Sequence, residues 1–173
     1  KLKNNNINFD SYITNKKKHS TEIVKKHIDE YKIFIAIGGD GIFHGVTQAI
    51  VNQKNKIIGI IPSGNGNMFA SHHSINNIED TIETIKKKKS TKMDLIKITY
   101  NTANENKTIY SHCIFGVGYI ADVVKLATKN FRILGPKLCY PISASIASIY
   151  SKNFKATYEI NDKKTITVNT TTP

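Results

Sequence analysis

The stretch IFIAIGGDGIFHGVTQAI, residues 33–50, runs from an apolar segment into three glycines that surround one acid, Asp40. The β-branched run at 32–37 is typical of a strand in a parallel sheet with both faces covered. The glycines predict a turn, and the apolar spacing after them predicts a helix over about 42–53. A strand that feeds a helix in this way brings backbone N–H groups and a helix N-terminus to one point, an arrangement that binds phosphate. Beside it, Asp40 could accept a proton from a hydroxyl or help to hold Mg²⁺.

A second unit of the same design follows in the next part of the chain. Its apolar strand, 56–61, leads into the turn PSGNGN and then into a short helix predicted near 67–73. Because the carboxyl ends of parallel strands lie at one edge of a sheet, both turns are expected to face the same ligand. Taken alone, Asp40 could equally be a plain helix N-cap. No P-loop and no G-x-G-x-x-G fingerprint occurs, so the sequence favours neither a Walker NTPase nor a Rossmann fold.

The remaining pattern divides the chain near residue 92. The first part adds a predicted strand at 7–13 and helices at 20–31 and 77–89, so that strands and helices alternate. The second part has a more antiparallel character, with predicted strands at 92–100 and 107–120, helical structure within 119–150 and a β-hairpin around NDKK. The predicted fold class is α/β: a parallel α/β domain over 1–91, followed by the start of an antiparallel, β-rich domain over 92–173.

The chain is strongly basic, with a formal net charge of +12. This charge predicts attraction to a polyanion such as nucleotide phosphates, nucleic acid or an anionic lipid surface. Nucleic acid is not favoured, because no interleaving of aromatic and basic residues and no zinc-finger spacing occurs. The lysine run at 86–89 is typical of a solvated helix end, with docking on an anionic membrane as the alternative. His44, His72 and His73 lack a Cys, His or Asp partner at ligand spacing, so no metal site is predicted.

The two cysteines, Cys113 and Cys139, are too few and too far apart for a disulfide framework. They are interpreted as buried thiols in a reducing compartment. No signal peptide opens the chain, and no apolar run reaches the ~18 residues that a membrane-spanning helix needs. A cytoplasmic protein that touches membranes only from outside is therefore expected.

Three segments together resemble a known group of enzymes. GGDGIFHGV (38–46) and IPSGNGNMFA (61–70) are similar to the GGDG signature and the P-x-G-[TS]-G-N segment of the lipid kinases of the diacylglycerol kinase and sphingosine kinase superfamily. GYIADVV, followed by NFRILG at 130–135, resembles the superfamily's strand-to-helix region that contacts lipid and nucleotide. The likeness extends over about 9–150.

The resemblance implies ATP-dependent transfer of the γ-phosphate, with Mg²⁺, to a primary hydroxyl of a membrane lipid. A sphingoid base is favoured, with ceramide or diacylglycerol as the other candidates. The first domain, over 1–91, would be the nucleotide-binding domain, and the second, β-sandwich-like domain would bind the lipid at an anionic membrane surface. Asp40 matches the family's catalytic acid, and Asp122 could contact the substrate. The positions that match nucleotide-binding residues are Thr14, Gly38, Gly39, Gly41, Ser63, Gly64, Asn65, Gly66, Asn67 and Arg132.

The sequence also departs from the family pattern. Gly45 stands where the family usually has Glu, and Ile114 and Val124 stand where sphingosine kinases tend to have Ser and Asp. No N-P-x-[SG]-G loop precedes residue 7, and further sandwich strands would be expected after Pro173, so the chain resembles a central fragment.

Two other functions stay open. NAD kinase shares the GGDG turn but usually follows it with Thr, where this chain has Ile42. A non-catalytic module that binds nucleotide or anionic lipid is suggested by Gly45 and the incomplete ends. Such a module should tolerate Asp40→Ala, whereas a kinase should lose turnover and still bind nucleotide.

Overall fold

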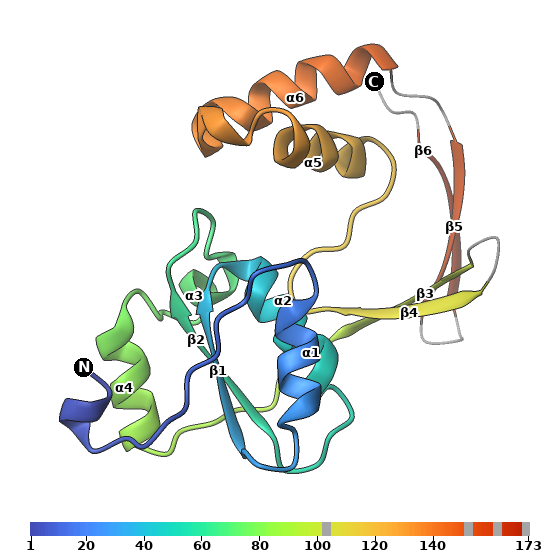
Figure 1. Cartoon of the computed structure of the whole chain (residues 1–173). Coiled ribbons are helices and arrows are strands. Elements are labelled where there is room, and N and C mark those ends of the chain that lie inside the picture. The colour runs from blue at the N-terminus through green and yellow to red at the C-terminus, as the bar shows by residue number, and fades with distance from the viewer. Residues whose placement is uncertain (102–104, 151–153, 161–163, 171–173) are drawn as a thin grey trace. The chain divides into compact units, whose positions relative to one another are not determined.

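The computed structural model describes residues 1–101, 105–150, 154–160 and 164–170 (Figure 1). It divides into two compact units, Lys1–Ile114 and Phe115–Pro173. The first unit contains η1 (Lys3–Asn5), α1 (His19–Lys26), β1 (Ile33–Gly38), α2 (Asp40–Ile50), β2 (Ile57–Pro62), α3 (Met68–His72), α4 (Ile78–Lys86), β3 (Ile96–Asn101) and β4 (Asn106–Ser111). The second contains α5 (Tyr119–Lys129), η2 (Arg132–Leu134), α6 (Pro136–Tyr150), β5 (Phe154–Ile160) and β6 (Lys164–Thr170).

The centre of the first unit is the parallel pair β1–β2, covered by α2. The register runs from Ile33 opposite Ile57 to Gly38 opposite Pro62, so the two strands end side by side. The predicted α/β class and the predicted meeting of both glycine turns at one sheet edge are therefore confirmed. The buried cluster combines residues of α1, α2 and α3 with residues of the two strands; its members are Val24, Ala36, Phe43, Val46, Ala49, Ile50, Ile60 and Ala70.

Burial of β1 on both faces, which the sequence suggested, is not observed. Ala36 is 2% exposed and belongs to the core, whereas Ile33 and Ile37 are 46% and 60% exposed. Successive side chains of a strand point to opposite faces. The face that carries Ala36 packs in the cluster with α2, and the face that carries Ile37 is largely open.

The strand predicted at 7–13 is wrong, because residues 7–15 have no regular structure. The segment is held to the end of α1 by side chains. The Tyr12 ring lies 4.4 Å from the ring of His27, centroid to centroid, and the Tyr31 hydroxyl donates to Asp10. That hydrogen bond to the Asp10 carboxylate raises the pKa of Tyr31. Aromatic and β-branched composition suited a strand, but these aromatic rings serve side-chain packing instead.

The antiparallel ladders of the predicted second part are present. β3 pairs with β4, and β5 pairs with β6, which confirms the hairpin around NDKK; residues 161–163 of its turn lie outside the described residues. β4 ends at Ser111, earlier than predicted, and Gly118 with φ +68° precedes α5. The two compact units divide after Ile114, and the functional boundary near residue 92 stays a prediction.

The second unit pairs two helices. The Tyr119 hydroxyl of α5 donates to the backbone oxygen of Ala144 in α6 (3.0 Å), and Ala127, Cys139 and Ala147 are buried. Among the described residues, no helix combines the length and the apolarity that crossing a membrane requires.

Candidate functional site

The two glycine turns touch each other through their backbones. Gly38 and Pro62 are the last paired residues of β1 and β2, and the Ser63 N–H donates to the Gly38 oxygen (3.0 Å). One residue further on, a Cβ added to Gly64 would lie 2.4 Å from the Cα of Gly39. No side chain fits in that gap, so glycine at this position lets the two turns lie in direct contact.

A side chain closes the second turn from within. The Asn67 side-chain oxygen accepts from the Gly64 N–H (2.9 Å), and its Nδ2 donates to the Gly64 oxygen (2.6 Å). Asn67 adopts a left-handed backbone with φ 47°, which Asn tolerates better than most residues. The predicted nucleotide-binding residue Asn67 thus has a structural task in shaping the turn.

Asp40 is the first residue of α2, and its carboxylate caps α3. The Met68 N–H donates to Oδ2 (3.1 Å) and the Phe69 N–H to Oδ1 (3.0 Å). These are two of the N-terminal donors that a helix cannot satisfy itself. The Phe69 ring stacks on the fully buried Phe43 of α2, with centroids 4.0 Å apart. Asp40 therefore does have an N-cap role, but it caps the helix of the opposite turn.

The capping contacts leave part of the carboxylate available. An ionised carboxylate offers about four lone-pair sites, and the two backbone donors use one on each oxygen. The carboxylate is thus oriented by the protein before any ligand arrives, and it can still accept from a hydroxyl or approach a cation.

The start of α2 is open, in contrast to the start of α3. A Cβ added to Gly41 would meet no atom within 4 Å. The first N–H groups of a helix have no intrahelical partner, and Gly41 at this end of α2 is exposed. Gly38, just before, has φ +157°, a conformation that side chains rarely adopt. The exposed start of α2 is suited to binding phosphate, and the oxygen donors of Asp40 suit Mg²⁺.

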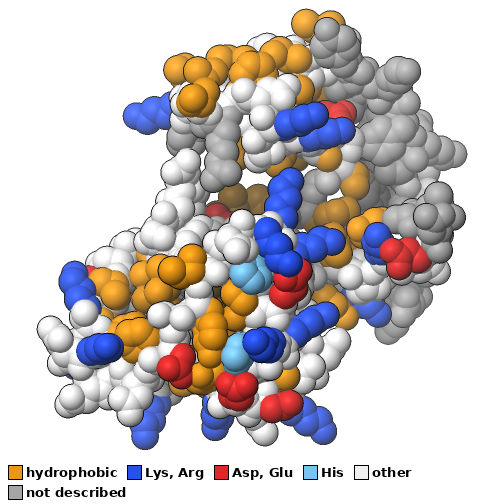
Figure 2. Space-filling view, in the orientation of Figure 1, with side chains coloured by type: hydrophobic (Ala, Val, Ile, Leu, Met, Phe, Trp, Pro, Cys, Tyr) orange, Lys and Arg blue, Asp and Glu red, His pale blue; other side chains and the backbone are white. Residues whose placement is uncertain are grey.

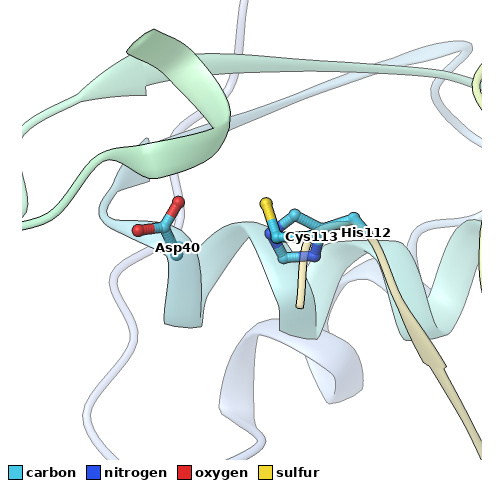
Figure 3. Close-up of side chains that lie close together, drawn as sticks. All are labelled: Asp40, His112 and Cys113. Atoms are coloured by element: carbon cyan, nitrogen blue, oxygen red, sulfur yellow. The ribbon is translucent and has the colours of Figure 1, made fainter. Parts of the chain in front are cut away.

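Two residues that sequence reasoning did not identify lie beside Asp40. The carboxylate oxygen of Asp40, a ring nitrogen of His112 and Sγ of Cys113 lie within 4.8 Å of one another. Figure 3 shows the three side chains along the N-terminal part of α2, with His112 and Cys113 entering from the end of β4. Their distance from Asp40 in the sequence hides the cluster, and the only local signal is an adjacent His-Cys pair after a strand.

The surroundings of His112 are largely apolar. Its ring meets those of Phe43 and Phe69 edge to face, with centroids 4.9 and 5.4 Å away. Burial lowers the pKa of His112; nearby His44 lowers it further, while Asp40 acts in the opposite direction. Burial also raises the pKa of the Cys113 thiol, and the charge of Asp40 adds to this. Both groups are thereby held in their neutral forms.

A side-chain clamp fixes β4 to α2. Nε2 of Gln48 donates to the Tyr110 oxygen (2.7 Å), and the Tyr110 N–H donates to Oε1 of Gln48 (3.0 Å). Asn52 adds a bond to the Tyr110 hydroxyl (3.3 Å). Because Tyr110 precedes His112 by two residues, this clamp sets where His112 and Cys113 meet the helix.

The departure at Gly45 has a packing explanation. Gly45 is buried under α1, and a Cβ added there would lie 2.0 Å from Oγ of Ser20. The Thr21 hydroxyl donates to the Gly45 oxygen (2.7 Å). α1 and α2 thus cross in contact at Gly45, and this arrangement has no room for glutamate.

The other predicted site residues are divided between the two units, with Asp122 and Arg132 in the second. Thr14 is half-buried in the irregular segment before α1, and within the described residues no hydrogen bond or ion pair joins it to either turn. Ser63, Asn65 and Gly66 lie in the second turn; a Cβ on Gly66 would come within 3.3 Å of Asp40 Oδ2. Asp122 is exposed on α5 of the second unit. Arg132 begins η2 there, and its side chain lies outside the described residues.

Positively charged side chains occur on both units. Figure 2 shows Lys and Arg side chains spread over this face of the molecule among acidic ones. Some are paired, as in Lys16 with Glu22 (2.6 Å) and Lys87 with Glu83. The lysine run at 86–89 spans the end of α4, as the sequence predicted for a solvated helix end.

Comparison with known proteins agrees with this geometry. The sequence-family model of the diacylglycerol kinase catalytic domain matches residues 1–98, which include both glycine turns. A curated relative, sphingoid long chain base kinase 4 of Schizosaccharomyces pombe, is 26% identical over 137 residues, covering 74% of this chain and 29% of the relative. The chain therefore spans less than a third of that relative's length.

Proposed function

The chain belongs to the diacylglycerol kinase catalytic domain family, and we propose that it carries the phosphate-transfer site of a lipid kinase that uses ATP and Mg²⁺. The observation that carries this proposal is the position of Asp40, whose oriented carboxylate lies between two glycine turns in contact. Bound Mg²⁺–ATP would supply the phosphoryl group and neutralise its charge.

Each part of the site has a task in this reaction. Backbone N–H groups at the open start of α2 would bind phosphate oxygens, and Gly38, Gly39 and Gly41 let the phosphates approach the main chain. The second turn, which includes Ser63, would border the nucleotide from β2. The free lone pairs of Asp40 would accept the proton of the lipid hydroxyl as it attacks.

For the lipid, we propose a sphingoid base, with ceramide and diacylglycerol as alternatives. The name of the yeast relative supports a sphingoid base. Ile114 and Val124, 68% and 43% exposed, are apolar at the positions where a sphingoid head would need polar partners. Asp122, exposed on α5, is the proposed substitute for those partners.

The setting and the domain division are proposed as well. With a net charge of +12, peripheral contact with an anionic membrane on the cytoplasmic side is favoured. We propose a nucleotide-binding domain over 1–91 and a lipid-binding domain over 92–173; the family match over residues 1–98 supports a catalytic domain in the first part of the chain. Arg132 and Thr14 are proposed to contact the nucleotide when it is bound.

The decisive experiment measures transfer of labelled phosphate from ATP to sphingosine, ceramide, diacylglycerol and NAD, using the full-length protein and anionic vesicles. Asp40→Ala is the test variant, and Asp94→Ala, at an exposed acid outside the turns, is its matched control. We expect transfer to one lipid, lost in Asp40→Ala and kept in Asp94→Ala, with nucleotide binding retained in both.

The other functions give different results. Transfer to NAD alone would identify a NAD kinase. Nucleotide binding without transfer to any acceptor, unchanged by Asp40→Ala, would favour the non-catalytic module.

A further inference from the structure

We infer that Asp40, His112 and Cys113 form a binding site for a thiophilic divalent cation, with Zn²⁺ as the preferred ion. The three side chains come from two elements of the first unit, the start of α2 and the segment after β4. The site differs from a nucleotide-bound Mg²⁺ site in its ligands, and metal binding here does not depend on the proposed kinase activity.

The geometry is close to that of a zinc centre. The three donor atoms lie within 4.8 Å of one another, whereas ligand atoms around tetrahedral zinc are about 3.5 Å apart. Closing this difference takes about 1 Å of side-chain movement. Cys113 lies beyond the end of β4 at Ser111, so its adjustment breaks no ladder hydrogen bond, while the Gln48 clamp holds the strand itself.

An independent observation points to a ligand at His112. Both ring nitrogens of His112 are closed off from solvent, and among the described residues neither has a hydrogen-bond partner. A buried polar group without a partner is costly and calls for an explanation such as an ion. A metal ion between His112 and Asp40 would give one of these nitrogens its partner.

The ligand set selects the metal. Imidazole, thiolate and carboxylate are zinc ligands, whereas Mg²⁺ prefers oxygen donors throughout. On binding, the Cys113 thiol loses its proton to solvent and a Zn–S bond forms. The two positive charges of the ion are then balanced by one thiolate and one carboxylate. Three protein ligands leave a fourth position for water, and the Asp40 oxygens keep their bonds to α3.

Such an ion would oppose the proposed reaction. Zinc on the Asp40 carboxylate occupies the lone pairs that would accept the proton of the lipid hydroxyl. Zn²⁺ should therefore inhibit transfer, and a chelator should restore it. This consequence rests on the proposed function, but the metal site itself does not.

The test is a titration of the full-length protein with Co²⁺, followed by its displacement with Zn²⁺. Cobalt takes the place of zinc and shows a thiolate-to-metal charge-transfer band only when sulfur is a ligand. We expect that band in the native protein, with a stoichiometry of one metal ion per protein chain. In Cys113→Ser the band should vanish and Zn²⁺ affinity should fall by more than about tenfold, since even indirect partners of metal ligands contribute 10- to 100-fold. His112→Asn should weaken binding similarly.

Matched controls come from the same chain. Cys139→Ser, at a buried thiol of α6, should leave the band and the affinity unchanged. His73→Asn, at one of two exposed adjacent histidines, should do the same. In the native protein, Zn²⁺ should also protect Cys113 from alkylation, as mapped by mass spectrometry. This measurement needs no variant and does not depend on how the variants fold.

A cobalt complex without the charge-transfer band, or full zinc affinity in Cys113→Ser, would overturn the site. Loss of binding in His73→Asn alone would likewise overturn it and assign the metal to the exposed histidines. Protection of Cys113 by zinc in a protein that transfers no phosphate would support the site and count against the proposed function alone.

Discussion

The two glycine turns have the same local design but opposite environments. Each follows a strand of the parallel pair and precedes a helix. At the first turn the start of α2 is free, since a Cβ on Gly41 would meet no atom within 4 Å. At the second, the N–H groups that open α3 are already bonded to Asp40. The first turn is therefore suited to a ligand and the second to holding the carboxylate.

This difference shows how a short segment can be both structural and functional. A carboxylate on a flexible loop would have to be oriented when the substrate binds, whereas Asp40 is oriented by two backbone donors in advance. Preorganised groups of this kind need little reorganisation energy at the moment of reaction. The same bonds make the position of α3 depend on Asp40, so stability and activity should both respond to its replacement.

Replacing Asp40 should separate these two roles. In both Asp40→Asn and Asp40→Ala we expect phosphate transfer to fall by about 10²–10⁴, the usual contribution of a general base. Asp40→Ala should also cost about 0.5–2 kcal/mol of stability, as lost helix caps do. Asp40→Asn should cost less, because its amide oxygen can still accept one N–H bond. Transfer rates and urea unfolding measure the two effects; equal stability losses would contradict a capping role.

The contact between the turns should break in Gly64→Ala. The added methyl would lie 2.4 Å from the Cα of Gly39. Neither atom can move away by a side-chain rotation, so the backbones of the two turns must separate. We expect a loss of about 1–3 kcal/mol, as for other overpacked sites, measured as a lower urea midpoint. Gly59→Ala on β2 is the control, because its methyl would find the nearest atom at an ordinary 3.7 Å. A native midpoint in Gly64→Ala would show that the turns can part freely.

Local patterns predicted the elements of this region well. The apolar runs predicted both strands, and glycine followed by helical spacing predicted the turns and α2. If the two strands pair in parallel, both turns lie at the same edge of the sheet. The pairing of Gly38 with Pro62 confirms this placement. These features depend on periodicity and backbone freedom, which neighbouring residues determine.

Features that depend on distant parts of the chain could not be predicted in this way. His112 and Cys113 reach Asp40 because Gln48 holds Tyr110 of β4 against α2, and the adjacent His-Cys pair does not by itself predict that contact. Residues 7–13 have strand composition, yet the Tyr12 ring packs on His27 at the end of α1. Gly45 departs from the family residue because α1 crosses α2 at that point, which only the packed structure reveals.

The closure of the second turn should weaken in Asn67→Gly. Glycine accepts the left-handed backbone at this position but removes both bonds between the side chain and Gly64. For a half-buried pair we expect a loss of about 1 kcal/mol, with a smaller effect on transfer than in any Asp40 variant. Urea unfolding and the transfer assay measure this. An effect on transfer as large as that of Asp40→Asn would mean that Asn67 contacts the nucleotide directly.

The openness of the first turn should be tested by Gly41→Ala, where we expect the smallest effect on stability. The methyl meets no protein atom within 4 Å, and alanine is favoured over glycine in a helix, so stability should stay equal or rise by up to about 1 kcal/mol. The same methyl occupies the space into which phosphate would fit, so ATP affinity should fall. Isothermal titration with Mg²⁺–ATP measures this loss, and thermal unfolding checks stability. Unchanged affinity would mean that the phosphates bind elsewhere. Weaker ATP binding at unchanged stability would show that the start of α2 is left free for the ligand, whereas the start of α3 is bonded to Asp40.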